Sequence, residues 1–437
     1  MRTMKMNRIL HIFMACVLAG IMILNGCDGS DDEKRDEILQ LGVILPLDND
    51  NGPLRENAIR TAIADINANG GIGDDIPIEL IVRSSAGEDR ATAAAAAAEQ
   101  ISQSAENLVG LISSYSSSSG GIIDWMSGDD FYPVISGSAT ADVLSGVSPY
   151  FRRLAPPDSL QAKVFKELCV QYGIQSVALA IQDGDSFSES LAARFREYYA
   201  QPIAAEVRIT AGDPDYRDKV NQILDGAPNA IFLSMLDADL GAEFLARLNQ
   251  YASDRDWGST YFLFSDALHN ASIFDGHDLQ FVIGSINDNP KNFGVMSAPD
   301  TSTSAYQHFE SELLQAYGQA VGSFNAQFYD AAYIFALAME TAIQTADPDE
   351  DDNFREAVNA AISLICNAQS AADTDIDPSD GWARMKQAVA NGAVNYEGAS
   401  GNCDTDANGN TMTSYQIFTI SGSPGSYEFE IIGYYTP

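Results

Sequence analysis

The alternation of short apolar runs with amphipathic helical stretches constrains this chain more than any other feature of its sequence. The first run, residues 38–47, is followed by a stretch in which apolar residues recur at helical spacing over 58–66. The pattern repeats as far as 150–158, where two adjacent prolines interrupt it, and it resumes over 160–285. Strands that alternate with helices predict parallel sheets with helices on both faces. We therefore predict an α/β fold with two lobes, one for each series.

After the second series, whose last predicted strand is 281–285, the pattern becomes helical. Residues 306–317, 326–345 and 354–366 carry apolar side chains at helical spacing. Residues 415–435 alternate between apolar and polar side chains around a Ser-Gly-Ser-Pro-Gly turn, which predicts a β-hairpin.

The first 26 residues are a secretory leader rather than part of the fold. Three basic residues precede an apolar run over 9–24, and the run ends in Leu-Asn-Gly followed by Cys27. This ending resembles a bacterial lipobox, which implies cleavage before Cys27 and a diacylglyceryl thioether on its sulfur. An ordinary signal peptide with an incidental cysteine is the alternative. Residues 27–37 are acidic and are expected to be a flexible tether.

Asp28 follows the lipobox and resembles the residue that retains lipoproteins at the inner membrane in enteric bacteria. We therefore expect a periplasmic, membrane-anchored lipoprotein, held at the inner membrane. No second apolar stretch approaches the roughly 18 residues that a membrane span requires, so the lipid is the expected membrane contact.

Acidic side chains dominate the composition. The chain has 61 aspartates and glutamates against 24 lysines and arginines, for a formal charge of −37. Such a surface repels nucleic acids and anionic membrane faces, so we expect neither as a partner.

Three cysteines of the mature chain remain after Cys27. Cys366 and Cys403 both lie in a polar, loop-rich region, and an oxidising compartment favours their pairing, so we predict a Cys366–Cys403 disulfide. Cys169 lies in an amphipathic stretch and is expected to be a small core residue.

Two predicted strands of the first series end in polar loops. The run 109–112 stops at the serine-rich segment 113–119, and the run 132–135 stops at Ser-Gly-Ser-Ala-Thr, residues 136–140. In open α/β sheets the ligand crevice lies at the carboxyl ends of the strands, and helix N-termini there favour an anionic group. We therefore predict a site for a small polar ligand at this edge; a flexible serine-rich linker is the alternative.

Short motifs along the chain recur in the order seen in one protein family. They are Gly-Val-Ile-Leu-Pro-Leu at 42–47, Ala-Asp-Ile-Asn-Ala-Asn-Gly-Gly-Ile at 64–72, Ile-Ser-Gly-Ser-Ala-Thr at 135–140, Tyr-Phe-Arg-Arg at 150–153, Pro-Pro-Asp-Ser at 156–159, Tyr-Asp-Ala at 329–331 and Asn-Tyr-Glu-Gly-Ala-Ser-Gly at 395–401. Together they resemble the branched-chain amino-acid-type substrate-binding proteins of ABC transporters, over nearly all of 38–437. The resemblance implies the type I periplasmic binding protein fold, with two parallel-sheet lobes joined by three crossover strands.

The three crossings divide the chain into lobes of discontinuous sequence. We expect 38–155 with 286–412 to form the first lobe, and 156–285 with 413–437 to form the second. The lobes of such a protein close on an amino acid or related small solute. We expect a monomer that delivers this solute to the permease subunits of an ABC transporter.

The resemblance assigns the ligand's carboxylate to the first lobe. A gap-free count back from the Ser-Ala-Thr turn gives Ser117 as the serine whose hydroxyl binds it, and Ser138, Ala139 and Thr140 of the turn supply the other contacts. An acid of the second lobe pairs with the ligand's ammonium, and Asp266 stands in that place. This division is physically reasonable, because a zwitterion needs donors at one end and a carboxylate at the other. For Asp266, an ordinary turn at a strand end is the alternative.

Two positions depart from the family's pattern. Phe187 stands where relatives of known amino-acid specificity carry a tyrosine, so the ring is kept and the hydroxyl is lost; it either walls the pocket or packs at a helix start. At Asp237 and its neighbours, carboxylates replace another expected tyrosine. They either suit a more cationic ligand or are solvated.

No motif in the sequence indicates catalysis or a cofactor. It contains no Gly-x-Ser-x-Gly elbow, no Cys-x-x-Cys pair and no phosphate-binding glycine loop. Segment 404–410 resembles a calcium loop at its first, third and sixth positions, but position twelve is Tyr415 instead of glutamate. We therefore expect no enzyme activity, no metal and no cofactor.

The sequence thus predicts a lipid-anchored protein that captures an amino acid or related small polar solute for uptake by an ABC transporter. A regulatory or sensory envelope lipoprotein of the same fold, acting through a protein partner, is the alternative. A cleft filled by side chains would favour this alternative.

Overall fold

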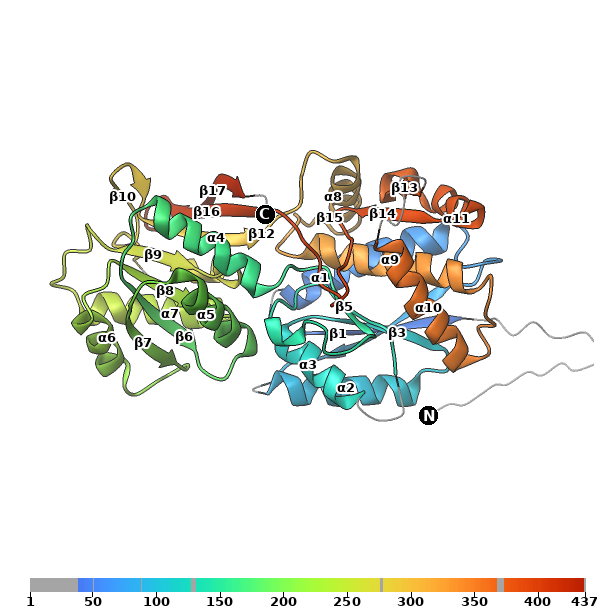
Figure 1. Ribbon diagram of the computed structural model, residues 1–437, viewed down its shortest axis with the longest axis horizontal. Coiled ribbons are helices and arrows are strands. Elements are labelled where there is room, and N and C mark those ends of the chain that lie inside the picture. The colour runs from blue at the N-terminus through green and yellow to red at the C-terminus, as the bar shows by residue number, and fades with distance from the viewer. Residues whose placement is uncertain are drawn as a thin grey trace, which may run out of the picture. The chain divides into compact units, whose positions relative to one another are not determined.

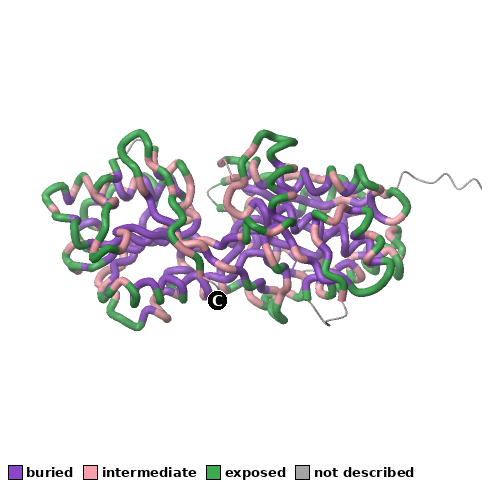
Figure 2. Tube along the Cα trace, turned by 90° about the horizontal axis from the view of Figure 1, so that it is seen from above, coloured by how far each residue is buried: buried purple, intermediate pink, exposed green. Residues whose placement is uncertain are grey.

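The computed structural model describes residues 38–49, 51–87, 89–126, 131–275, 278–367 and 373–435. The leader, Cys27 with its predicted lipid, Asp28 and the tether lie outside these residues. Within them, no helix combines the length and the apolar character that crossing a bilayer demands. Figure 2 shows the buried residues in the interior and the exposed residues at the periphery.

The first lobe is built on a five-stranded parallel sheet. In spatial order its strands are β2 (Ile78–Ser84), β1 (Leu39–Leu45), β3 (Leu108–Ser113), β4 (Val134–Ser136) and β5 (Phe151–Arg153). Helices α1 (Asn51–Ala68) and α9 (Asn325–Ala342) cover one face, and α2 (Arg90–Ser104) and α3 (Ser116–Trp125) cover the other (Figure 1). Side chains alternate accordingly: Val43 of β1 packs under α1 and α9, whereas Ile44 packs toward α2 and α3.

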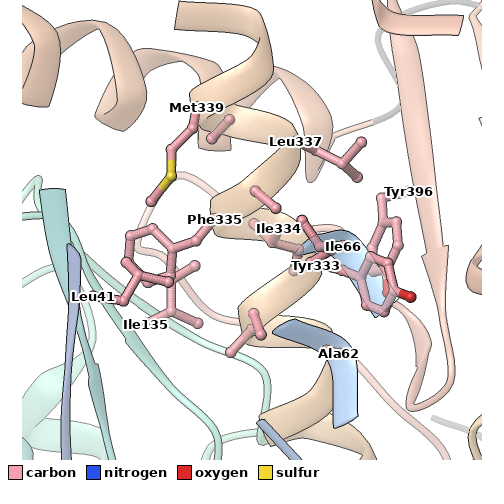
Figure 3. Close-up of a cluster of buried hydrophobic side chains, with 14 of the residues drawn as sticks. Leu41, Ala62, Ile66, Ile135, Tyr333, Ile334, Phe335, Leu337, Met339 and Tyr396 are labelled. Atoms are coloured by element: carbon pink, nitrogen blue, oxygen red, sulfur yellow. The ribbon is translucent and has the colours of Figure 1, made fainter. Parts of the chain in front are cut away.

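Helix α9 is the centre of this lobe, because nearly every one of its residues is buried. Figure 3 shows Phe335 pointing toward Leu41 and Ile135 of the sheet, while Tyr333 lies beside Tyr396. The other elements on the α9 side of the first lobe are α8 (Ser304–Tyr317), α10 (Asp351–Ile365), α11 (Trp382–Asn391), the short sheet of β13 (Thr374–Ile376), β14 (Val394–Gly398) and β15 (Gly401–Asn402), and the 3-10 turn η4 (Pro378–Asp380). The 3-10 turn η1 (Asp142–Leu144) lies on the opposite face, where Leu144 packs in the cluster of α2 and α3.

Asp330 of α9 anchors the turn between β14 and β15. Its Oδ1 accepts hydrogen bonds from the Tyr396 hydroxyl at 2.8 Å and the Ala399 N–H at 2.9 Å. Its Oδ2 accepts from both the N–H and the hydroxyl of Ser400. Burial raises the pKa of Asp330, and these donors oppose the rise. The Tyr-Asp-Ala and Asn-Tyr-Glu-Gly-Ala-Ser-Gly motifs are therefore partners that hold one buried carboxylate.

The second lobe contains a seven-stranded sheet. In spatial order its strands are β17 (Glu428–Tyr435), β16 (Tyr415–Ser421), β12 (Asn292–Ser297), β9 (Tyr261–Phe264), β8 (Ala230–Ser234), β6 (Val177–Gln182) and β7 (Ile203–Ile209). Neighbouring strands are parallel except where β16 pairs with β12 and β17, which confirms the predicted C-terminal hairpin.

Helices cover both faces of this second sheet as well. One face packs against α4 (Asp158–Gln171) and α5 (Ser186–Tyr199), and the other against α6 (Tyr216–Asp225), α7 (Ala238–Tyr251), η2 (Asp266–Leu268) and η3 (Ala271–Phe274). A two-stranded ribbon, β10 (Ser285–Ile286) and β11 (Asn289–Pro290), precedes β12. The prediction of two parallel-sheet lobes is confirmed.

One strand of the second sheet differs from the prediction. The predicted strand 281–285 is instead a turn that buries Val282 and ends at Gly284, whose φ of 130° is unfavourable for other residues. The strand that follows, β12, pairs with β9 and β16. The chain therefore returns to the first lobe after Ser297, whereas we placed that return at residue 286.

Three connections join the lobes, at 154–157, 298–303 and 411–414. The first and third are tied together by Arg153, which is fully buried at the end of β5. Its guanidinium donates five hydrogen bonds: two to Asn410 Oδ1, two to the carbonyls of Ala139 and Ala141, and one to the Ser145 hydroxyl. The Arg153 N–H also donates to the Gly409 carbonyl at 3.0 Å.

The predicted Cys366–Cys403 disulfide is wrong, because both thiols are free and buried, as is that of Cys169. The Cys403 thiol contacts the Gly401 carbonyl at 3.4 Å and Asp330 at 3.8 Å, and it is thus part of the Asp330 cluster. Cys366 caps α10, and burial raises the pKa of its thiol to about 12. Cys169 packs in the core against α5, as expected.

Candidate functional site

A cavity of about 40 Å³ lies where the carboxyl ends of strands from both sheets meet. We call it the interlobe cavity. Its lining residues are Asn51, Arg55, Tyr115, Ser116, Ser138, Thr140, Phe187, Leu236, Asp266, Ala267, His269, Asn270, Ser323 and Phe324. This space is enough for a few water molecules.

The serine-rich loop after β3 builds the wall of the first lobe by bonding mostly to itself. The Ser136 hydroxyl donates to the Ser114 carbonyl at 2.7 Å, and the hydroxyls of Ser113 and Ser119 are 2.8 Å apart. This network is buried, so its role is to fix the ends of β3 and β4 against each other. It leaves few serine hydroxyls free to face the cavity.

Ser116, the first residue of α3, lines the cavity instead of Ser117. Its hydroxyl accepts hydrogen bonds from the N–H groups of Thr140 at 3.1 Å and Ala141 at 3.0 Å. The Ser117 hydroxyl is buried without a partner and belongs to a neighbouring hollow. Because successive helical residues are about 100° apart, a shift of one residue moves the side chain out of the cavity.

The Ser-Ala-Thr turn contributes two of its three residues to the cavity. Ser138 and Thr140 line it, whereas Ala139 is fully buried behind them. The N–H of Ala139 donates to the Ser136 hydroxyl at 3.1 Å. The turn therefore offers hydroxyls to a ligand, while the N–H groups of residues 139–141 are occupied within the protein.

Arg55 of α1 reaches the cavity from the opposite side of this wall and is only 3% exposed. Its guanidinium lies over the rings of Tyr115 and Phe328, at 4.9 and 5.2 Å, and Nη1 donates to the Ser114 hydroxyl at 2.9 Å. Nε has no hydrogen-bond partner. Burial lowers the pKa of Arg55, which Tyr115 and Asp266 oppose, and the group stays a cation.

Asp266 and Phe187 line the cavity from the second lobe. Asp266 begins η2 directly after β9 and is 5% exposed, and its Oδ1 has no hydrogen-bond partner. Burial raises the pKa of Asp266 to about 6, opposed by the amide of Gln161 and nearby backbone N–H groups. Phe187, the second residue of α5, is buried with its ring in the lining.

Asp237 has a different place from the one we expected. It is the exposed N-cap of α7, where its carboxylate accepts from the N–H groups of Asp239 and Leu240. It borders an outer hollow that also contains Arg90, not the interlobe cavity. The capping role satisfies the orphan amides of the helix and accounts for this acid.

Two further titratable residues stand at the site. His269 lines the cavity between the rings of Phe418 and Phe429, and burial lowers the pKa of its imidazole to about 4, so it is neutral at pH 7. Asp158 starts α4 behind Thr140, and its N–H donates to the Thr140 carbonyl at 2.8 Å. Burial raises the pKa of Asp158 to about 8, opposed by the hydroxyls of Ser190 and Thr140.

The sequence therefore located four of the lining residues: Ser138, Thr140, Phe187 and Asp266. It missed Arg55 and His269. For Arg55 a signal was present, since it lies three and four residues before Ala58 and Ile59 and so continues the buried stripe of α1. A buried arginine in such an apolar stripe needs an anion or a hydrogen-bond acceptor. His269 carries no comparable signal.

The calcium-like segment 404–410 uses its acids internally. The Asp406 carboxylate accepts from the N–H groups of Asn408 at 2.8 Å and Asn410 at 2.9 Å. No group of three histidine, cysteine or acidic side chains among the described residues is arranged to hold a metal ion.

Comparisons with known proteins agree with this geometry. Residues 54–423 match the family model described as the receptor family ligand binding region. A search of curated proteins found no match to the sequence. Among solved structures, the fold is similar to that of a leucine-binding protein, LivK, from Thermotoga maritima, with 18% identity over 92% of this chain and 99% of that chain and a TM-score of 0.69.

Two other solved structures extend the comparison. The branched-chain amino acid transporter substrate-binding protein LivJ from Streptococcus pneumoniae, in complex with isoleucine, is 17% identical over 91% of this chain and 99% of that chain, with a TM-score of 0.67. An ABC transporter solute-binding protein from R. palustris, in complex with benzoate, is 15% identical over 92% of this chain and 97% of that chain, with a TM-score of 0.64.

Proposed function

The chain belongs to the protein family described as the receptor family ligand binding region, and it has the type I periplasmic binding protein fold. On this basis we propose that it is a solute-binding protein. It captures an amino acid or related small polar solute between its lobes and serves uptake by an ABC transporter. It carries out no chemistry on the solute.

The observation that carries this proposal is the interlobe cavity with unpartnered polar atoms on both of its walls. Arg55 Nε and Asp266 Oδ1 are buried without hydrogen-bond partners, and they belong to different lobes. A buried polar group without a partner costs free energy, so such atoms are expected where a ligand supplies the missing partner. A binding site between lobes meets this expectation, whereas a packed interface does not.

Within this site, the hydroxyls of Ser138 and Thr140 contact the solute from the first lobe, and Asp266 pairs with its ammonium from the second. Phe187 supplies an apolar wall. Phe187 lacks the hydroxyl of a tyrosine, so the ammonium relies on the carboxylate of Asp266.

The proposal includes the setting of the protein. Cys27 carries the lipid that anchors the chain to the inner membrane, residues 28–37 tether it, and the lobes work in the periplasm as a monomer. The permease subunits of the transporter are its protein partners. Replacement of Cys27 by serine should release the protein from membranes, which fractionation with detergent phase separation would measure.

Thermal shift of the full-length protein against amino acids, polyamines, amides and short carboxylates tests the capture of a solute. A ligand at 100 times its Kd stabilises the folded state by about 2.7 kcal/mol. The Asp266→Ala/Thr140→Ala double variant should lose this shift. A folded protein that responds to no compound would contradict solute capture and favour the lipoprotein that acts through a protein partner.

A further inference from the structure

Arg55 is a buried cation without a counterion. No carboxylate of the described residues lies within ion-pair distance of its guanidinium, although Asp266 is close enough to influence its pKa. The side chains that hydrogen-bond to it, Ser114 and Tyr115, carry neutral hydroxyls. Taking a guanidinium out of water without compensation is unfavourable by several kcal/mol. The position therefore calls for an anion that is not part of the chain.

The guanidinium of Arg55 is also held in a fixed orientation. The rings of Tyr115 and Phe328 lie within 4.9 and 5.2 Å of its central carbon, and Ser114 holds Nη1. Arginine presents its donors in a planar fork that matches a carboxylate, so a fixed guanidinium is prepared to bind one. Nε is free to be one of these donors.

The rest of this wall has little to offer an anion. The N–H groups of Ala139, Thr140 and Ala141 already donate to serine hydroxyls of the chain. The other first-lobe side chains that can still donate to a ligand, those of Asn51, Tyr115, Ser138, Thr140 and Ser323, are neutral. Across the cavity the unpartnered charge is negative, at Asp266.

Resting on the proposed function, we propose that Arg55 binds the ligand's carboxylate, and that the cavity therefore takes small zwitterions with the carboxylate at Arg55 and the ammonium at Asp266. The hydroxyls of Ser138 and Thr140 then orient the ligand rather than carry its charge. A compound of the same shape whose carboxylate is replaced by an amide is excluded, because it leaves Arg55 buried without a counterion.

Matched pairs of acids and amides test this directly. The proteinogenic amino acids, together with the α-amides of leucine, phenylalanine and glutamate, are titrated by calorimetry into the full-length protein purified in detergent. The best-binding acid should bind at least 10-fold more tightly than its amide. Arg55→Met should weaken the acid by about 100-fold, the size expected for a charge-assisted hydrogen bond, and leave the amide unchanged. Arg55→Lys should restore part of the preference.

Arg90→Met is the matched control. Arg90 also lies over the Tyr115 ring, at 5.6 Å, but it borders the outer hollow and not the interlobe cavity. This variant should keep the preference for the acid. If Arg90→Met abolished the preference and Arg55→Met did not, the assignment of the anion site to Arg55 would be overturned.

The unliganded protein provides a readout that needs no ligand. Removing an unpaired buried charge should leave the melting temperature of Arg55→Met unchanged or raise it. If Arg55 instead forms a structural contact with Asp266, then Arg55→Met and Asp266→Asn each lower the melting temperature and the double variant lowers it no further. That result would overturn the proposal.

The outcomes of the titrations separate the two proposals. Binding of an acid that Arg55→Met weakens supports both. Binding of an amide or an amine in preference to every acid contradicts the role of Arg55 and leaves solute capture standing. A folded protein that binds no compound of the panel contradicts both.

Discussion

Arg153 and Arg55 are both buried arginines of the first lobe, but they have opposite surroundings. Arg153 donates five side-chain hydrogen bonds, all to groups of the chain. Arg55 donates to neutral hydroxyls and leaves Nε without a partner. Two buried carboxylates differ in the same way, since Asp330 receives donors on both oxygens and Asp266 has none on Oδ1.

This difference separates structure from function within one molecule. Where a buried charge finds all its partners in the chain, it connects elements: Arg153 joins two connections between the lobes, and Asp330 joins α9 to the turn after β14. Arg55 and Asp266, which are left incomplete, both face the interlobe cavity. Both kinds of side chain are buried. The number of missing hydrogen-bond partners therefore distinguishes a structural from a functional charge.

The largest expected effect is at Arg153. Arg153→Met removes all five hydrogen bonds that its guanidinium donates, so we expect the free energy of unfolding to fall by about 3–5 kcal/mol. Urea denaturation followed by circular dichroism would measure it. A loss below about 1 kcal/mol would mean that filled hydrogen bonds do not distinguish Arg153 from Arg55.

The two carboxylates give a smaller contrast. Asp330→Asn replaces an acceptor of the Ser400 or Ala399 donors by an NH₂ group, and we expect a loss of about 2 kcal/mol. Asp266→Asn removes an unpaired buried charge and should leave the unfolding free energy unchanged or higher. Both are measured by the same denaturation assay, and equal losses in the two variants would break the comparison.

Asp158 makes stability depend on pH. Its folded-state pKa of about 8 lies above the roughly 3.9 of an unfolded aspartate, so the folded state holds an extra proton between these values. Its contribution to stability is therefore full below pH 4 and is lost as pH rises toward 8, with a slope of up to about 1.4 kcal/mol per pH unit. Asp158→Asn should flatten this part of a pH series of melting temperatures, whereas an unchanged slope would assign the dependence to other acids.

The smallest effect is expected at a glycine of α3. A Cβ at Gly120 of α3 would meet only Leu144, at 3.9 Å, whereas a Cβ at Gly398 would meet Asp330 at 2.4 Å. Gly120→Ala should therefore stabilise by at most about 1 kcal/mol through helix propensity, and Gly398→Ala should destabilise. Melting curves of the two variants would show opposite signs; a stabilising Gly398→Ala would contradict the close packing around Asp330.

The sequence predicted the fold well because each βα unit carries its own periodic pattern. It failed at β12, where Asn292 and Gly294 lower the strand propensity and partners distant in sequence decide the pairing. It also failed for Cys366 and Cys403, since polar surroundings in the sequence gave no indication that both thiols are buried.

Prediction of the site was limited by two unknowns: the exact position of the binding serine along the chain, and which buried charges have counterions. Ser117 was chosen over Ser116 by a gap-free count back from the Ser-Ala-Thr turn, and a difference of one residue decides which serine faces the cavity. Arg55 could be recognised as buried from the stripe of α1, but its missing counterion is a three-dimensional fact. A carboxylate can be sought in the sequence, whereas its absence near a guanidinium cannot.

The bonds of Arg153 to Asn410 and of its N–H to Gly409 have a mechanical consequence. They clamp two of the three connections at their first-lobe ends, so those two must turn as a pair when one lobe rotates against the other. The pivot is then confined to the few residues beyond the clamp, 154–157 and 411–414, and the two prolines at 156 and 157 stiffen one of these segments. The lobes are therefore expected to rotate about essentially one hinge axis.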